Sequence, residues 1–401
     1  MSDDRLLLSR RGQAGGEESG ILTPDGIFVR ADGRPWWGVG VTAFPMTERW
    51  AFNRPAVYAF ADWMVSHKAG IARVLSMTHK GDCLGVGNFG PQDVGGEDAF
   101  VAICVELTDY LASRGRRIDL QVFADMQTDD CKPNNPLSQI DQPRLYGKVN
   151  AALAGKWNVI LGYGNQAAKN GFDPYALPLP HGVFGTRGSG LEDELPFLPP
   201  YQAAEFHPGR NLDFARKYKS VYEMRIGETG EANGFQKVPG PIFFTEPIRI
   251  GEHTNGSACS DPHLMWDFAA GCKGWGVAAL YGHLETGRDL LLPGPRATAT
   301  FDAMVDAWTR IPADFALGSY ARGDGHGGNR DLSVYHHDTH IDGQYFPDGA
   351  LRTYELTIGN ESLVIVTDPG PTWTLRIQHG AVVESWGYGH GRPDTVFRMR
   401  R

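Results

Sequence analysis

Cysteine is scarce in this 401-residue sequence, which contains five cysteines and no CxxC motif. Paired CxxC motifs hold many structural zinc sites, so their absence excludes that class of site and favours reduced thiols. No hydrophobic run approaches the roughly 18 residues that a membrane helix requires. The opening residues also lack the apolar core of a secretory signal peptide, so we expect cytoplasmic synthesis and no membrane partner.

Positive charge is also limited. Lys and Arg number 38 against 47 Asp and Glu, which leaves a net charge of -9, and no long basic run occurs. This balance disfavours a nucleic-acid partner, because binding to phosphates depends on clustered cations. No GxGxxG motif follows the first predicted strand, which removes the common dinucleotide-binding fold. We therefore expect no cofactor.

Glycine, in contrast, is abundant. The chain has 51 glycines, together with 41% hydrophobic and 21% charged residues. A typical protein has roughly 7% glycine, so this chain needs many strand ends and loops, while its apolar content is enough for a folded core. The sequence therefore predicts a globular protein rich in tight connections.

Short β-type runs alternate with amphipathic helical patterns along the first three quarters of the chain, as parallel sheets with crossover helices require. Eight strands are predicted, and their number favours an α/β fold of the closed (β/α)₈ TIM barrel type. The predicted strands are Trp36–Phe44, Ile71–Met77, Ile118–Asp125, Asn158–Asn165, Gly182–Arg187, Gln202–His207, Pro241–Glu246 and Trp275–Tyr281.

The pattern divides the chain into three parts. Residues 1–24 have no structural periodicity and are expected to form a flexible N-terminal arm. Residues 25–315 carry the barrel, with a hairpin over 26–37 and a long loop over 188–201. Residues 316–401 show period-two runs and turn residues, which predict a small antiparallel, β-sandwich-like C-terminal domain.

In a (β/α)₈ barrel the functional side chains lie at the carboxyl ends of the strands. Aromatic faces mixed with hydrogen-bonding groups suit a sugar, and the strand ends here carry both kinds. The candidate substrate-binding residues are Arg73, Asp125, Asn165, His207, Tyr281 and His283. Structural alternatives stay open: Arg73 could orient a carboxylate, and the histidines and the tyrosine could simply fill the barrel mouth.

Several segments together resemble one family. DGRPWWGVGVTAF, the arginine of ARVLSM, GYGNQ, KNGFDP, EFHPGR and PIFFTEP stand in the order and strand positions of the cellulase-like glycosidases, which include glycoside hydrolase family 5. The resemblance covers about residues 25–310. It implies that Glu246, at the end of the seventh strand, is the nucleophile, and that a Glu after Asn165 is the acid/base. A carboxylate paired with Arg73 or Arg249 is the structural alternative for Glu246.

The chain departs from this family at the acid/base position, where Gln166 follows Asn165. A primary amide can donate a hydrogen bond but has no proton to transfer, and positioned proton transfer contributes about 10² to 10⁴-fold. Ordinary retaining hydrolysis is therefore not expected. Glu205 could replace the missing acid, a substrate with a good leaving group could need none, or the barrel could only bind its glycan.

The sequence thus predicts a glycoside-hydrolase-like protein that binds an oligo- or polysaccharide and cleaves it weakly or not at all. The alternative is a structural or adhesive, virion-associated component of a phage particle or surface assembly, which would contact other particle proteins through the N-terminal arm or the C-terminal domain. The segment YHHDTHID contains metal-ligand types, but such polar loops are usually solvated, and we predict no metal site.

Overall fold

The computed structural model describes residues 38–77, 89–123, 140–165, 176–190, 203–208, 241–255, 258–274 and 277–310, together with short strands on either side of this core and the helical residues Lys217 and Ser220. Of the strands after residue 318 the backbone alone is described. Within the described residues no helix is long and apolar enough to cross a membrane.

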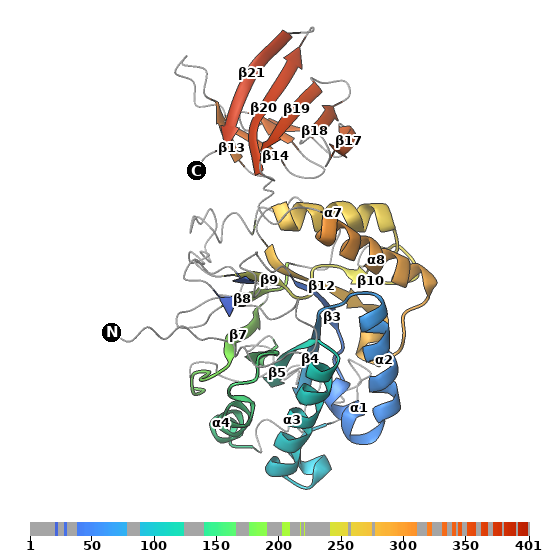
Figure 1. The fold of residues 1–401 in the computed structure, drawn as a ribbon, viewed down its shortest axis with the longest axis vertical. Coiled ribbons are helices and arrows are strands. Elements are labelled where there is room, and N and C mark those ends of the chain that lie inside the picture. The colour runs from blue at the N-terminus through green and yellow to red at the C-terminus, as the bar shows by residue number, and fades with distance from the viewer. Residues whose placement is uncertain are drawn as a thin grey trace, which may run out of the picture.

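Eight of the described strands are parallel and close into a barrel (Figure 1). The order around the barrel follows the chain, and the last strand, β12, pairs with both β9 and β3. The strands are β3 (Gly38–Thr42), β4 (Ile71–Met77), β5 (Arg117–Phe123), β6 (Val159–Gly164), β7 (Phe184–Gly190), β8 (Ala203–Phe206), β9 (Ile242–Phe244) and β12 (Val277–Leu284). All eight predicted strands are confirmed, and with them the α/β barrel class.

The described helices lie on the outside of this barrel (Figure 1). They are α1 (Met46–Phe52), α2 (Arg54–Ser66), α3 (Glu97–Ser113), α4 (Gln142–Leu153), α7 (Pro262–Gly274) and α8 (Pro295–Arg310). Helix α4 shows why such segments are helical: Asp141 accepts a hydrogen bond from the Arg144 backbone N–H at 3.0 Å, which satisfies a donor that the first turn leaves unpaired.

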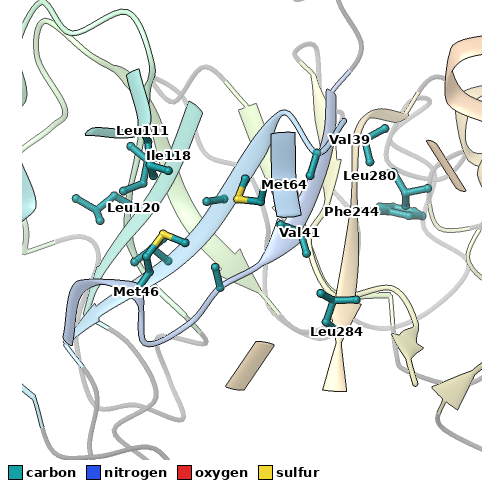
Figure 2. Packing of buried hydrophobic residues seen from close by; sticks show 14 of the residues in the cluster. Val39, Val41, Met46, Met64, Leu111, Ile118, Leu120, Phe244, Leu280 and Leu284 are labelled. Atoms are coloured by element: carbon teal, nitrogen blue, oxygen red, sulfur yellow. The ribbon is translucent and has the colours of Figure 1, made fainter. Parts of the chain in front are cut away.

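Strand residues alternate between two environments, as period-two geometry requires. On β5, Ile118, Leu120 and Val122 belong to a large apolar cluster shared with the helices, whereas Asp119 and Gln121 do not. Figure 2 shows part of this cluster, with side chains from both strands and helices. A second apolar cluster combines residues from six strands of the barrel; it comprises Ile71, Ile160, Phe184, Ala203, Phe243, Ala278, Ala279 and Tyr281.

Glycine makes this interior possible at two positions. A Cβ on Gly40 would meet the Tyr281 ring at 2.5 Å, and a Cβ on Gly162 would meet the Gln121 amide oxygen at 2.2 Å. Both distances are shorter than real Cβ contacts, so each glycine leaves room for a large side chain from another strand of the barrel. Part of the glycine excess therefore serves packing inside the barrel.

Four short strands and two 3₁₀ helices are also described before residue 311. They comprise β1 (Ile21–Leu22), β2 (Phe28–Val29), β10 (Arg249–Ile250), β11 (Ala258–Cys259), η1 (Pro91–Val94) and η3 (Glu285–Arg288). Strands β1 and β2 form an antiparallel hairpin, which begins before the predicted one. Strand β7 extends to Gly190, so the first residues of the loop predicted over 188–201 are strand instead.

Nine further strands, all paired antiparallel, follow residue 318. They are β13 (Ser319–Arg322), β14 (Asp331–Val334), β15 (Thr339–Ile341), β16 (Gln344–Phe346), β17 (Leu351–Thr357), β18 (Ser362–Thr367), β19 (Thr372–Gln378), β20 (Ala381–Gly389) and β21 (Arg392–Met399). Their side chains lie outside the described residues, so the sandwich-like domain and the three domain boundaries stay predictions.

Candidate functional site

Glu246 lies two residues beyond β9, at the carboxyl end of the barrel. The backbone N–H of the preceding Thr245 donates to the Phe206 carbonyl at 3.1 Å, so the ladder between β8 and β9 continues to the edge of the site. The Glu246 side chain is 1% exposed. Because the strand ladder holds its backbone on one side, the carboxylate has a fixed place at the barrel mouth.

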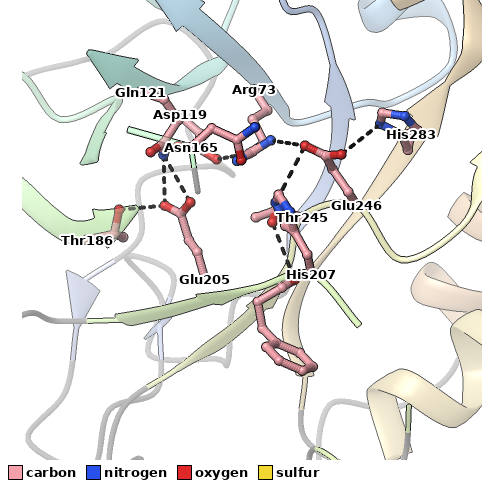
Figure 3. Close-up of polar contacts among 11 residues, drawn as sticks. Arg73, Asp119, Gln121, Asn165, Thr186, Glu205, His207, Thr245, Glu246 and His283 are labelled. Atoms are coloured by element: carbon pink, nitrogen blue, oxygen red, sulfur yellow. Dashed lines mark hydrogen bonds and ion pairs between the residues drawn. The ribbon is translucent and has the colours of Figure 1, made fainter. Parts of the chain in front are cut away.

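Three cationic or imidazole groups surround the Glu246 carboxylate (Figure 3). Arg73 Nη1 donates to Oε1 at 2.8 Å, and His207 Nε2 lies 3.5 Å from the same oxygen. His283 Nδ1 lies 3.8 Å from Oε2. These groups come from three different elements, since Arg73 is on β4, His207 follows β8, and His283 is on β12. The surroundings stabilise negative charge on Glu246.

Arg73 contacts several other residues of the site. Its side chain is fully buried, and its Nη2 donates to Asn165 Oδ1 at 3.4 Å while Nε lies 3.6 Å from Asp119 Oδ2. Burial by itself lowers the pKa of Arg73, but the carboxylates of Glu246 and Asp119 outweigh it and raise that pKa above its ordinary value. The guanidinium is therefore a permanent buried cation between two carboxylates.

Asn165 reaches Arg73 because the β5–β6 ladder extends to it. Its backbone N–H donates to the Phe123 carbonyl at 2.9 Å, directly after β6 ends at Gly164. The amide is buried at 4% exposure. Asn165, directly after β6, and Glu246, after β9, thus both contact a guanidinium that comes from within β4.

A second polar set lies among the strands themselves (Figure 3). Gln121 Nε2 donates to Asp119 Oδ1 at 2.6 Å and to the two oxygens of Glu205 at 3.0 and 3.1 Å. The Thr186 hydroxyl donates to Glu205 Oε1 at 2.5 Å. All four side chains are fully buried. We call Asp119, Gln121, Thr186 and Glu205 the interior polar set.

The two carboxyls of the interior polar set hold their protons unusually tightly. Burial raises the pKa of Glu205 to about 8, with a further increase from the negative charge of Asp119. Burial likewise raises the pKa of Asp119 to about 6, although Arg73 and the Gln121 hydrogen bond oppose the shift. Burial and these two carboxylates also raise the pKa of Tyr281 well above its ordinary value. At neutral pH Glu205 is therefore a neutral acid.

Comparison with known proteins identifies the fold. No family model and no curated protein sequence matches the chain. Among solved structures, a glycoside hydrolase family 5 structure from Bacteroides vulgatus ATCC 8482 is 12% identical with a TM-score of 0.51, covering 95% of this chain and 92% of that one. A second structure, named as a glycoside hydrolase, is 13% identical with a TM-score of 0.54 and covers 96% and 94%. The fold is that of a glycoside hydrolase barrel.

Sequence identities this low show that the fold is shared, and they do not show a shared activity. The structure brings four of the predicted site residues together around Glu246. Arg73, His207 and His283 lie next to its carboxylate, and Asn165 contacts Arg73. Their predicted roles in binding and catalysis stay predictions. Gln166 and Asp125 lie outside the described residues.

Two other predicted site residues, Glu205 and Tyr281, are buried and contact other residues of the barrel strands. Glu205 has its carboxyl bound by Gln121 and Thr186, and Tyr281 packs against Gly40 within the second apolar cluster. Sequence reasoning missed Asp119 and Gln121. Their signal was present in IDLQVF, where polar residues alternate with apolar ones in a strand that is buried on both faces.

Proposed function

We propose that this protein binds a glycan at the carboxyl end of its barrel and cleaves it only slowly, with Glu246 as the nucleophile. The observation that carries the proposal is the buried 2.8 Å ion pair between Arg73, on β4, and Glu246, which follows β9 in a barrel with the fold of glycoside hydrolases. A buried carboxylate that is held ionised and oriented at the active end of such a barrel is suited to attack an anomeric carbon.

The chemistry of that attack defines what else the site needs. A bond forms between a Glu246 oxygen and the anomeric carbon, while the bond to the leaving oxygen breaks and its electron pair departs with that oxygen. An alkoxide leaving group needs a proton at this moment. Gln166, which follows Asn165 in the sequence, has none to give. Substrates whose leaving groups are stable as anions avoid this requirement.

Glu205 is the other candidate for the missing acid, and its pKa of about 8 keeps it protonated at neutral pH. Its side chain has no exposed surface, however, and both of its oxygens are already engaged by Gln121. An acid must reach the leaving oxygen within hydrogen-bond distance. We therefore infer that Glu205 has a structural role inside the barrel. Slow turnover then requires a substrate whose leaving group departs without a proton.

The test compares hydrolysis of aryl glycosides with activated leaving groups, across a panel of sugars, in wild type and two variants. Wild type should be slow, because water must still attack the glycosyl-enzyme and Gln166 cannot act as the base for that step. Gln166→Glu, which restores the base, should be faster by about 10² or more, and Glu246→Gln should abolish turnover. Gln92→Glu, a matched change at an exposed glutamine, should leave the rate unchanged. Oligosaccharide binding is measured in parallel by calorimetry.

The proposal fails if Gln166→Glu gains nothing, Glu246→Gln loses nothing, and no oligosaccharide of the panel binds. Binding without turnover in every variant would retain the glycan site and remove the nucleophile from it. The Gln92→Glu control separates a specific gain from a general effect of added negative charge.

A further inference from the structure

The Arg73 guanidinium has two edges, and a carboxylate faces each of them. Nη1 donates to Glu246 at 2.8 Å, and Nε, on the other edge, lies 3.6 Å from Asp119 Oδ2. Asp119 stands directly beside Arg73, because β4 and β5 pair in a register that sets these two residues opposite each other. A planar guanidinium transmits orientation from one edge to the other, since its nitrogens move as one rigid group.

Asp119 is itself held in place by the rest of the interior polar set. Gln121 Nε2 binds it at 2.6 Å, and the same nitrogen binds both oxygens of Glu205. The room for the Gln121 amide comes from Gly162, where any side chain would collide with it. A continuous line of contacts therefore runs across the barrel, from Glu205 through Gln121 and Asp119 to the guanidinium.

The charges along this line are coupled. Asp119 faces the Arg73 cation on β4, the Glu205 carboxyl on β8 and the Tyr281 hydroxyl on β12, and each of these interacts with it electrostatically. When Asp119 is ionised, its carboxylate and that of Glu246 both interact with the single positive charge of Arg73. The interaction is strong because fully buried charges are little screened by solvent.

We propose that Asp119 is a positioning residue, which holds the Nε edge of Arg73 and so fixes the guanidinium against Glu246. The proposal rests on the proposed function, because the position of Glu246 matters most if it is the nucleophile. Asp119 is not expected to touch the glycan. Its effect reaches the reacting carboxylate through Arg73 alone.

The first test is spectroscopic and needs no substrate. The carboxyl carbons of glutamate are labelled with ¹³C, and the Glu246 signal is identified by its loss in Glu246→Gln. In wild type that signal should show a step near pH 6, where Asp119 titrates. The step should remain in His207→Gln and in His283→Gln, which remove the two imidazoles that also face Glu246. Asp119→Asn should abolish the step. Asp302→Asn, a matched change at an aspartate that pairs with His67 on the outer helices, should retain it.

The second test is kinetic and uses activated aryl glycosides, with Gln166→Glu as the background if wild type is slow. Asp119→Ala should lower kcat by about tenfold and change KM less than about twofold, because the loss affects positioning in the transition state rather than binding. Asp119→Asn should recover part of kcat, since its amide can still hold the guanidinium edge weakly. If Asp119→Ala does not fold, kcat is compared between wild type and Asp119→Asn only, and the Asn variant should have the lower value.

The outcomes separate this proposal from the proposed function. A step at Glu246 that Asp119→Asn removes supports the positioning role even if no variant hydrolyses any glycoside, in which case only the proposed function fails. If wild type shows no step at Glu246, or if the step persists in Asp119→Asn, the positioning role is overturned, whether or not any glycoside is hydrolysed.

Discussion

Glu205 should make the protein less stable as the pH rises, and replacing it should remove that dependence. Its pKa is about 8 in the folded protein against an ordinary value of 4.5, so the folded state binds this proton more tightly than the unfolded state does. The contribution to stability is therefore complete below pH 4.5 and is lost as the pH rises to about 8. Glu205→Gln has no proton to lose.

The size of the effect follows from the shift. Where only one state is protonated, the free energy of unfolding changes by about 1.4 kcal/mol for each pH unit. Asp119 has the same sign of dependence, but its pKa of about 6 confines its own titration mostly to lower pH. Because the folded protein is itself half deprotonated at pH 8, the Glu205→Gln variant should therefore gain about 2 kcal/mol relative to wild type between pH 6 and 8.

The glutamine can keep the existing contacts, which makes the comparison clean. Its amide nitrogen can donate to the Thr186 hydroxyl, and its oxygen can accept from Gln121, both of which contact Glu205 in wild type. The free energy of unfolding is measured by urea denaturation at pH 6, 7 and 8, followed by near-UV circular dichroism. Glu106→Gln, at a carboxylate that is 51% exposed, serves as the matched control.

A stability difference between wild type and Glu205→Gln that stays constant from pH 6 to 8 would refute the reasoning. It would mean that Glu205 is ionised in the folded protein at neutral pH. The Glu106→Gln control should show no such gain, because solvent screens the charge of a half-exposed carboxylate.

Three further predictions follow from described contacts. Gly162→Ala should lower the free energy of unfolding by about 1 to 3 kcal/mol in urea denaturation, since its Cβ would meet the Gln121 amide at 2.2 Å; an unchanged midpoint would contradict this. Arg73→Lys should reduce aryl glycoside turnover by at least about tenfold, because an ammonium cannot bridge Glu246 and a second carboxylate in a rigid fork; equal rates would contradict it. Burial raises the pKa of Cys104 to about 12, so mass spectrometry should find this thiol unlabelled by maleimide until the protein is denatured.

The barrel could be predicted from the sequence because its strands are short apolar runs bounded by glycine and polar residues. Helix α2 has clear sequence signals, since Pro55 stands near its start and Val57, Phe60 and Met64, which share one apolar face, are buried. Helix α4 has a weaker signal in its cap, Asp141. Helix α1 is only seven residues long, too short to show a clear period.

The site was most predictable where residues follow a strand. Asn165 and Glu246 could be placed together because parallel strands end at the same edge of the barrel, whereas Arg73, within β4, was named as a candidate that also belongs to the segments resembling the glycosidases. The link from Asp119 through Gln121 to Glu205 depends on which strand residues point inward and on side chains that meet across the barrel, and a sequence does not give those distances. The phage-particle alternative and the cellular location stay predictions.

The most direct test of Glu246 as a glycosidase nucleophile is covalent labelling by a 2-deoxy-2-fluoroglycosyl fluoride. Fluoride leaves without a proton, so Gln166 is no obstacle, and the fluorine at C2 slows release of the glycosyl group from the enzyme. With one sugar of a panel, mass spectrometry should find the fluoroglycosyl group on the peptide that contains Glu246 and no label in Glu246→Gln. A label on another residue, or turnover of a fluoride without a trace of label on Glu246, would contradict the assignment.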